Sequence, residues 1–347
     1  MDSARRGSAV RLGLAVGISA GAFWLALRQT DFGAFRAAVA GASLVWLLPY
    51  PFICIALNVL RGEIWTRLLE RRVTLAPAFW AYSVGFLVNN VLPFRVGEAT
   101  RVVVLSTRSG LPLVEVAAAA GLERLLDMIA LAVMLALIAP TLGRLPGLTN
   151  GALGVVVVVF AGVVSIWIVV RFRDRAATLI ARLTARLPQH IGRGVLDQWS
   201  EFVRGLSVLL RPSIGLPTAG GALIVWTLTV LLQWFVLKSF QPHAEFVDAA
   251  LMVAAISLAI ALPAAPGFLG VYHWAGQQAL VSAFPGRYDP STALAAAIVA
   301  HAVSYFTSSA IGVVGLWYFG VAPSKIAGIP SQHQPVERAS QIAGMVE

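Results

Sequence analysis

Long apolar runs, separated by short polar stretches, limit what this chain can fold into more than any other feature. The runs cover residues 12–27, 44–60, 113–138, 153–170, 216–237 and 294–319. A helix of roughly 20 apolar residues crosses the hydrocarbon core of a bilayer, and only helices and closed barrels satisfy their backbone hydrogen bonds there. The composition, 58% hydrophobic and 12% charged, is typical of such proteins. We therefore expect an all-α polytopic membrane protein with about six full spans.

Two further apolar runs are shorter, and each is interrupted. Residues 77–92 lead into Pro93 and Gly97, and residues 249–262 lead into the proline- and glycine-rich stretch 263–270. Proline cannot continue the hydrogen-bond ladder of a helix, and freed backbone groups are tolerated in a membrane only inside protein or beside a cavity. These runs predict two broken or re-entrant helical segments.

The two interrupted segments occupy corresponding places in the two halves of the chain. Pro93-x-x-x-Gly97 and Pro266-x-x-x-Gly270 share a spacing, and similar apolar runs flank each one. By the distribution of Arg, the first segment enters from the cytoplasm and the second from outside. We expect two inverted repeats, at about residues 44–138 and 214–319, an arrangement that points to a central transport site. Chance recurrence of Pro and Gly is the alternative.

Arginine marks the side of the membrane on which each loop lies. The run 44–60 ends in RGEIWTRLLERR, which returns the chain to the cytoplasmic side. Residues 171–212 hold eight Arg among apolar residues, which predicts amphipathic helices along an anionic cytoplasmic leaflet; a solvated linker with one charged face is the alternative. Residues 1–11 are expected in the cytoplasm, 12–322 as one integral domain of a bacterial inner membrane, and 323–347 as a disordered cytoplasmic tail.

Ionisable residues inside apolar sequence are costly and therefore mark candidate functional positions. On a helix, Glu123 and Asp127 share one face, and two carboxylates in a low-dielectric interior need cations. Arg95 and Arg101 of the first interrupted segment, with Arg124, balance three negative charges. A partly free guanidinium would bind a lipid phosphate, while the carboxylates hold it in place or bind a cationic head group. Alternatively, the network only fastens the segment to its neighbouring helix. The expected head-group site comprises Asn89, Asn90, Arg95, Glu98, Arg101, Glu123, Arg124 and Asp127.

The second half offers polar residues but few charges. His301 and Tyr305 lie one helical turn apart and are expected to face the second interrupted segment, although a lone membrane His is more often structural than functional. The expected second wall and hinge comprise Pro263, Pro266, Gly267, Gly270, His273, His301 and Tyr305. With five His, one Cys and no H-E-x-x-H pattern, neither a metal site nor a cofactor is expected, and nothing indicates nucleic-acid binding.

Three ordered motifs resemble those of a known family. They are N-N-x-L-P-x-R-x-G-E-x-x-R from Asn89 to Arg101, E-R-x-x-D from Glu123 to Asp127, and P-x-x-P-G-x-x-G from Pro263 to Gly270. Together they are similar to the transmembrane domain of lysylphosphatidylglycerol synthases, over about residues 12–319. The resemblance implies a flippase-like domain that moves lipids between leaflets, and the sequence contains no aminoacyl-transferase domain.

The functional expectation is a flippase-like transporter that moves a phospholipid, hopanoid or polyprenyl-linked lipid head group through a charged intramembrane cavity. Its partners would be membrane lipids and a lipid-synthesis enzyme. Two alternatives stay open: a non-transporting accessory or scaffold subunit of a lipid or glycolipid pathway, and a membrane-embedded transferase that uses a carboxylate as base. No nucleophile elbow or Asp-rich metal motif supports an enzyme, so we expect none.

Overall fold

The computed structural model describes residues 2–92, 95–139, 146–184, 189–261 and 265–320, and all regular structure in them is helical. The first half contains α1 (Asp2–Leu27), α2 (Phe32–Ala40), η1 (Leu44–Leu47), α3 (Tyr50–Leu68), α4 (Leu75–Val91), α5 (Val96–Ser109) and α6 (Leu113–Leu137). The remainder contains α8 (Pro146–Arg171), α9 (Arg173–Thr184), α10 (Gln189–Ser207), η2 (Val208–Leu210), α11 (Pro212–Phe240), α12 (Phe246–Ala259), η3 (Pro266–Phe268), α13 (Val271–Ala283) and α14 (Pro290–Tyr318).

Four segments of the described chain are long and apolar enough to cross a membrane. They are Leu44–Leu68, Asn150–Arg171, Pro212–Phe240 and Pro290–Tyr318. The other two expected spans differ from these: the apolar part of α1 is only Val16–Leu27, and α6 carries three ionisable residues near its middle. The chain is thus a multi-pass helical protein, as the apolar runs predict.

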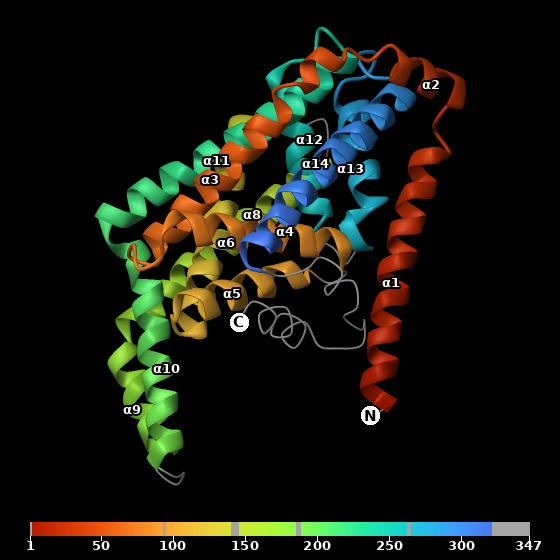
Figure 1. Ribbon diagram of the computed structural model, residues 1–347. Coiled ribbons are helices and arrows are strands. Elements are labelled where there is room, and N and C mark those ends of the chain that lie inside the picture. The colour runs from red at the N-terminus through yellow and green to blue at the C-terminus, as the bar shows by residue number, and fades with distance from the viewer. Residues whose placement is uncertain (1, 93–94, 140–145, 185–188, 262–264, 321–347) are drawn as a thin grey trace.

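Helices from the two halves pack side by side and run in opposite directions. α3 and α11 lie together in Figure 1. At one end Glu70, just after α3, pairs with Arg211, just before α11 (2.5 Å); at the other end, the Ser43 N–H donates to the carbonyl of Ser239 (2.8 Å). α4 likewise runs antiparallel to α14. One apolar core joins α3 to α6, and another joins α6 to α11–α14.

The first interruption separates α4 from α5, as the sequence predicts. Arg95 has a left-handed backbone (φ 53°) directly before α5. Asn89 accepts a hydrogen bond from the Gly97 N–H (2.8 Å), so an Asn side chain replaces part of the broken ladder. A Cβ at Gly97 would lie 1.9 Å from the carbonyl oxygen of Gly85. Only glycine allows α5 to fold back this closely on α4.

The second interruption separates α12 from α13. Gly267 and Gly270 have positive φ angles of 64° and 84°, which glycine adopts without steric cost. The turn packs against α1, because the Ala265 N–H donates to Ser19 Oγ (2.8 Å) and a Cβ at Gly270 would lie 2.0 Å from the Ser19 carbonyl. α1 therefore covers the second break. Pro263 lies outside the described residues.

The arginine-rich segment forms a helical hairpin of α9 and α10. Figure 1 shows it projecting from the same end of the molecule as the start of α1. At its base, Arg204 of α10 contacts buried Glu115 at the start of α6 (3.0 Å), and Arg72 contacts the same carboxylate. The prediction of one or two amphipathic helices is confirmed for the element type, while their placement along a leaflet stays a prediction. Residues 323–347 also lie outside the described chain.

Candidate functional site

The two carboxylates that share a face of α6 meet a cation from α3. Arg61 donates from Nη1 to Glu123 (2.9 Å) and to Asp127 (2.6 Å). Indole N–H groups add two more hydrogen bonds, from Trp65 to Glu123 (2.7 Å) and from Trp226 to Asp127 (3.0 Å). Glu123 has no exposed surface, so these donors replace the water that its carboxylate has lost.

Two further arginines complete an ion-pair cluster. Arg101 of α5 contacts Glu123 (3.0 Å) and Glu98 (2.6 Å). Arg124 of α6 contacts Glu98 (2.7 Å) and Asp127 (3.2 Å). With Arg61, three positive charges balance three negative ones. The cluster is neutral as a whole, which a low-dielectric interior requires.

The expectation that Arg95 supplies the third positive charge is wrong. Arg95 donates to the carbonyl of Ile260 (2.8 Å) and lies over the ring of Phe268, 5.3 Å from its centroid. Its left-handed backbone precedes α5, and its side chain runs toward the second interruption instead of toward α6. Arg95 therefore joins the two breaks, and Arg61 takes its place in the cluster.

Arg61 is the site residue that the sequence reading misses. The run 44–60 puts Arg61 at the cytoplasmic end of a span, but α3 continues to Leu68. Leu57, Arg61, Trp65 and Leu68 recur at helical spacing on one face, and Trp65 and Leu68 are buried. That periodicity was the available signal that Arg61 points inward.

The two interruptions meet face to face. Asn90 donates to Ser309 Oγ (2.9 Å) and Ser308 Oγ (3.1 Å) of α14, and Tyr305 donates to the Asn90 carbonyl (3.3 Å). A Cβ at Gly267 would lie 3.1 Å from the ring of Tyr305. The Asn90 side chain at the first break therefore bonds to α14. Tyr305 of α14 faces the second interrupted segment, which is where the sequence analysis expects it.

Two histidines form a buried pair behind the second turn. His273 Nε2 lies 3.0 Å from His301 Nδ1, and the Gly270 N–H lies 3.4 Å from His273 Nδ1. Tyr272 stacks on His301, with ring centroids 4.5 Å apart. The position of His301 beside the second interruption agrees with the sequence, and the pair is held within the protein core.

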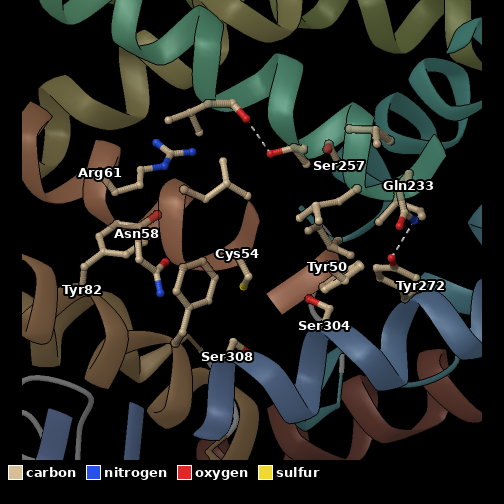
Figure 2. A pocket seen from close by; sticks show the side chains of 18 residues that line it. Tyr50, Cys54, Asn58, Arg61, Tyr82, Gln233, Ser257, Tyr272, Ser304 and Ser308 are labelled. Atoms are coloured by element: carbon tan, nitrogen blue, oxygen red, sulfur yellow. Dashed lines mark hydrogen bonds between the residues drawn. The ribbon is translucent and has the colours of Figure 1, made fainter. Parts of the chain in front are cut away.

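A cavity of about 280 Å³ lies between the halves, with walls from α3, α4, α11, α12, α13 and α14. Figure 2 shows Arg61 on one side of it, with Gln233 and Tyr272 on the other. Its polar lining residues are Tyr50, Asn58, Arg61, Tyr82, Thr229, Gln233, Ser257, Tyr272, Ser304 and Ser308. Polar groups that converge on an enclosed space are the general mark of a ligand site.

None of the expected site residues that the structure describes lines this cavity. The cluster of Glu123 and Asp127 adjoins it through Arg61, and the second turn adjoins it through Ile260 and Tyr272. The residues expected to form the site therefore lie behind the residues that line the cavity, and do not themselves line it. A second recess of about 270 Å³ lies between α6, α11 and α12, and its lining side chains are apolar except for Trp226 and Thr227. The first cavity has more side chains that can bind a polar ligand, so it is the better candidate site.

Comparison with known protein families identifies one that covers most of the chain. Residues 12–312 match the sequence profile of the lysylphosphatidylglycerol synthase transmembrane region. The chain is 26% identical over 311 residues to the glycosyltransferase AglD of Haloferax volcanii, covering 80% of this chain and 48% of that protein. It is 25% identical over 291 residues to a UPF0104 membrane protein of Methanothermobacter thermautotrophicus, covering 79% of this chain and 84% of that protein.

The chain thus spans about half the length of the first of these relatives (48%) and most of the second (84%). No solved structure shows significant similarity.

Proposed function

The chain belongs to the lysylphosphatidylglycerol synthase transmembrane-region family, and on that premise we propose that it moves the polar head group of a membrane lipid through the cavity between its halves. The observation that carries this proposal is the cavity itself: residues of six helices line it, ten of their side chains are polar, and it lies beside the place where the two interrupted segments meet. The lipid tails stay in the bilayer while the head group crosses, so the cost of placing polar groups in hydrocarbon falls.

The helix arrangement supports an alternating-access mechanism. In the proposed scheme α3 to α6 and α11 to α14 are inverted repeats, consistent with the antiparallel packing of α3 on α11. Interrupted helices at corresponding places in such repeats form the central sites of transporters. Arg95 and Asn90 hold the two interruptions together, and movement of one repeat against the other would open the cavity to alternate sides.

The ion-pair cluster has a positioning role in this scheme. Arg61 alone of its members lines the cavity, while the rest lie behind it. Glu123 and Asp127 hold the guanidinium in one orientation, as a preorganised ligand site requires. We place the protein in a cytoplasmic membrane, with the α9–α10 hairpin and the N-terminus on the cytoplasmic side, because arginine-rich segments stay on that side.

Leaflet exchange in liposomes tests this function. Purified protein, reconstituted with a trace of acyl-chain-labelled phosphatidylglycerol, should increase the fraction of label that a membrane-impermeant reductant bleaches at early times. Ser257→Phe, which fills the cavity from α12, should slow exchange at least tenfold. Ser200→Phe makes the same change at an exposed position of α10 and should exchange lipid like the parent.

Other results would favour the alternatives. A parent protein that exchanges no phosphatidylglycerol and no other labelled lipid would be an accessory subunit. If a new lipid product forms from a supplied glycosyl donor, the protein is a transferase, in line with the name of its archaeal relative. If Ser257→Phe exchanges lipid as fast as the parent, the lipid head group does not cross through this cavity.

A further inference from the structure

The charge of the cavity lining is unusual for a site that handles charged lipids. Of the eighteen residues that line it, Arg61 alone is charged. The other polar groups are hydroxyls and amides, contributed by all six helices around the cavity. Such a lining offers one place for a negative charge and many hydrogen bonds for uncharged groups.

Arg61 has a free edge toward the cavity. Its Nη1 atom makes both contacts with the carboxylates, and among the described residues no acceptor contacts Nε or Nη2. Neither of these atoms is among the fully buried polar atoms that lack a partner, so both keep some accessible surface. A guanidinium edge with two parallel N–H groups matches two oxygens of a phosphate.

The cavity offers no counter-charge for a cation. Both oxygens of Glu123 are occupied, one by Arg61 and the other by Trp65 and Arg101. Asp127 is occupied in the same way, by Arg61 and Trp226 on one oxygen and Arg124 on the other. Both carboxylates lie behind Arg61, and neither lines the cavity. An ammonium group there would lose its water without gaining an anion.

The far side of the cavity suits hydroxyl groups. Gln233 donates from Nε2 to the Tyr272 hydroxyl (2.9 Å), which leaves the Tyr272 proton and the Gln233 carbonyl oxygen for a ligand. Figure 2 shows this pair across the cavity from Arg61. A volume of about 280 Å³ is close to the lower limit of ligand pockets, roughly 300 Å³, so it fits a head group and not a whole lipid.

We propose that the cavity selects a lipid whose phosphodiester carries one negative charge and whose terminal group is uncharged and hydroxylated, and that it rejects lipids with an ammonium group. This inference rests on the proposed function and names its substrate class. The phosphodiester binds the free edge of Arg61, and the hydroxyls bind Gln233 and Tyr272. Phosphatidylglycerol has this chemistry, whereas an aminoacylated phosphatidylglycerol does not.

Equilibrium binding tests the selection without any transport step. Calorimetric titration of the full chain in detergent would compare three probes: dihexanoyl-phosphatidylglycerol, its lysyl ester, and the soluble phosphodiester glycerophosphoglycerol. The parent protein should bind dihexanoyl-phosphatidylglycerol at least tenfold more tightly than the lysyl ester. Equal or tighter binding of the lysyl ester, or no binding of any probe, would overturn the proposal. Equal affinity for glycerophosphoglycerol would overturn the assignment to a lipid.

One isosteric variant sharpens this test. Gln233→Glu places a carboxylate opposite Arg61 and keeps an acceptor for Tyr272, so it should weaken phosphatidylglycerol binding about tenfold and strengthen binding of the lysyl ester. Gln278→Glu makes the same change at a half-buried position outside the cavity and should bind both lipids like the parent. If the two variants behave alike, net charge and not the cavity controls selection.

The two proposals fail in different experiments. A protein that binds phosphatidylglycerol selectively but exchanges no lipid in liposomes contradicts the transport function alone. A protein that exchanges lipids but binds the lysyl ester as well as phosphatidylglycerol contradicts the selection alone.

Discussion

At the scale of single residues, two of the four non-glycine residues with positive φ angles in the described chain lie where the halves meet. Arg95 and Phe268 are non-glycine residues with positive φ angles, 53° and 59°, one at each interruption, and they contact each other. Such conformations cost about 1–3 kcal/mol each and persist at functional sites. Arg61 is the other unusual residue, because its charge is shared between a buried cluster and an open cavity.

Loss of Arg61 should destabilise the protein. Arg61→Met removes a donor from two buried carboxylates, and breaking a buried ion pair costs about 3–5 kcal/mol. The midpoint of thermal unfolding in one detergent should fall clearly. In the double variant Arg61→Met/Asp127→Asn the midpoint should recover in part, because the second change removes one of the negative charges that Arg61 had balanced.

Arg71→Met is the control for this prediction. Arg71 pairs with Glu63 at 2.9 Å but is 65% exposed, and exposed ion pairs contribute about 1 kcal/mol or less. If Arg61→Met and Arg71→Met lower the midpoint equally, the cluster is not the stabilising feature described above.

At the scale of elements, ion pairs at the helix ends hold separate segments together. The α9–α10 hairpin is attached to α6 through Arg204 and Glu115, while most of its own surface is exposed. At the start of α12, Arg287 contacts both oxygens of buried Asp248 (2.9 Å each). Apolar packing has little directionality, so it fixes the relative orientation of two helical segments only weakly. These ion pairs add a directional contact between the segments.

Glu115→Gln should loosen the hairpin. The change removes the carboxylate that Arg204 and Arg72 share, and it leaves Arg204 only its pair with Glu201 of the same helix. A loss of about 1.4 kcal/mol in docking raises the open population tenfold. Trypsin should then cleave within α9 and α10 roughly tenfold faster, with sites identified by mass spectrometry. Asp174→Asn, at a side chain 93% exposed, should leave the rate unchanged; similar acceleration in both variants would contradict the docking role of Glu115.

At the scale of the whole molecule, one end is rich in arginine and the other is closed by short connections. Figure 1 shows α2 at the opposite end of the molecule from the α9–α10 hairpin. The start of α1 lies at the hairpin end, and the positive-inside rule assigns that end to the cytoplasm. In the proposed orientation, α1 runs from the cytoplasmic side toward the outer side, and its apolar part covers only Val16–Leu27.

Thiol labelling tests this topology. In a Cys54→Ala background, which lacks the one native cysteine, Ala37→Cys on α2 should react with a membrane-impermeant maleimide in intact cells. Thr178→Cys on α9 should react only after the membrane is opened. Both positions are exposed, so labelling of both from the same side would contradict the assigned orientation.

The sequence by itself determined the helical class, most helix positions, the two interruptions and the presence of a neutral buried cluster. These follow from local chemistry: apolar length predicts spans, Pro and Gly interrupt helices, and buried charges require partners. The resemblance in three short motifs was confirmed by the family match over residues 12–312.

Only the tertiary structure decided which residues meet. Whether Arg61 or Arg95 completes the cluster depends on where α3 ends and on the left-handed turn before α5, neither of which is visible in a pattern of apolar residues. The cavity is lined by neutral side chains such as Gln233, Ser257 and Tyr272, which carry no charge to mark them in the sequence. They became a site because packing of the two halves leaves space between six helices, and such space is a property of the whole arrangement.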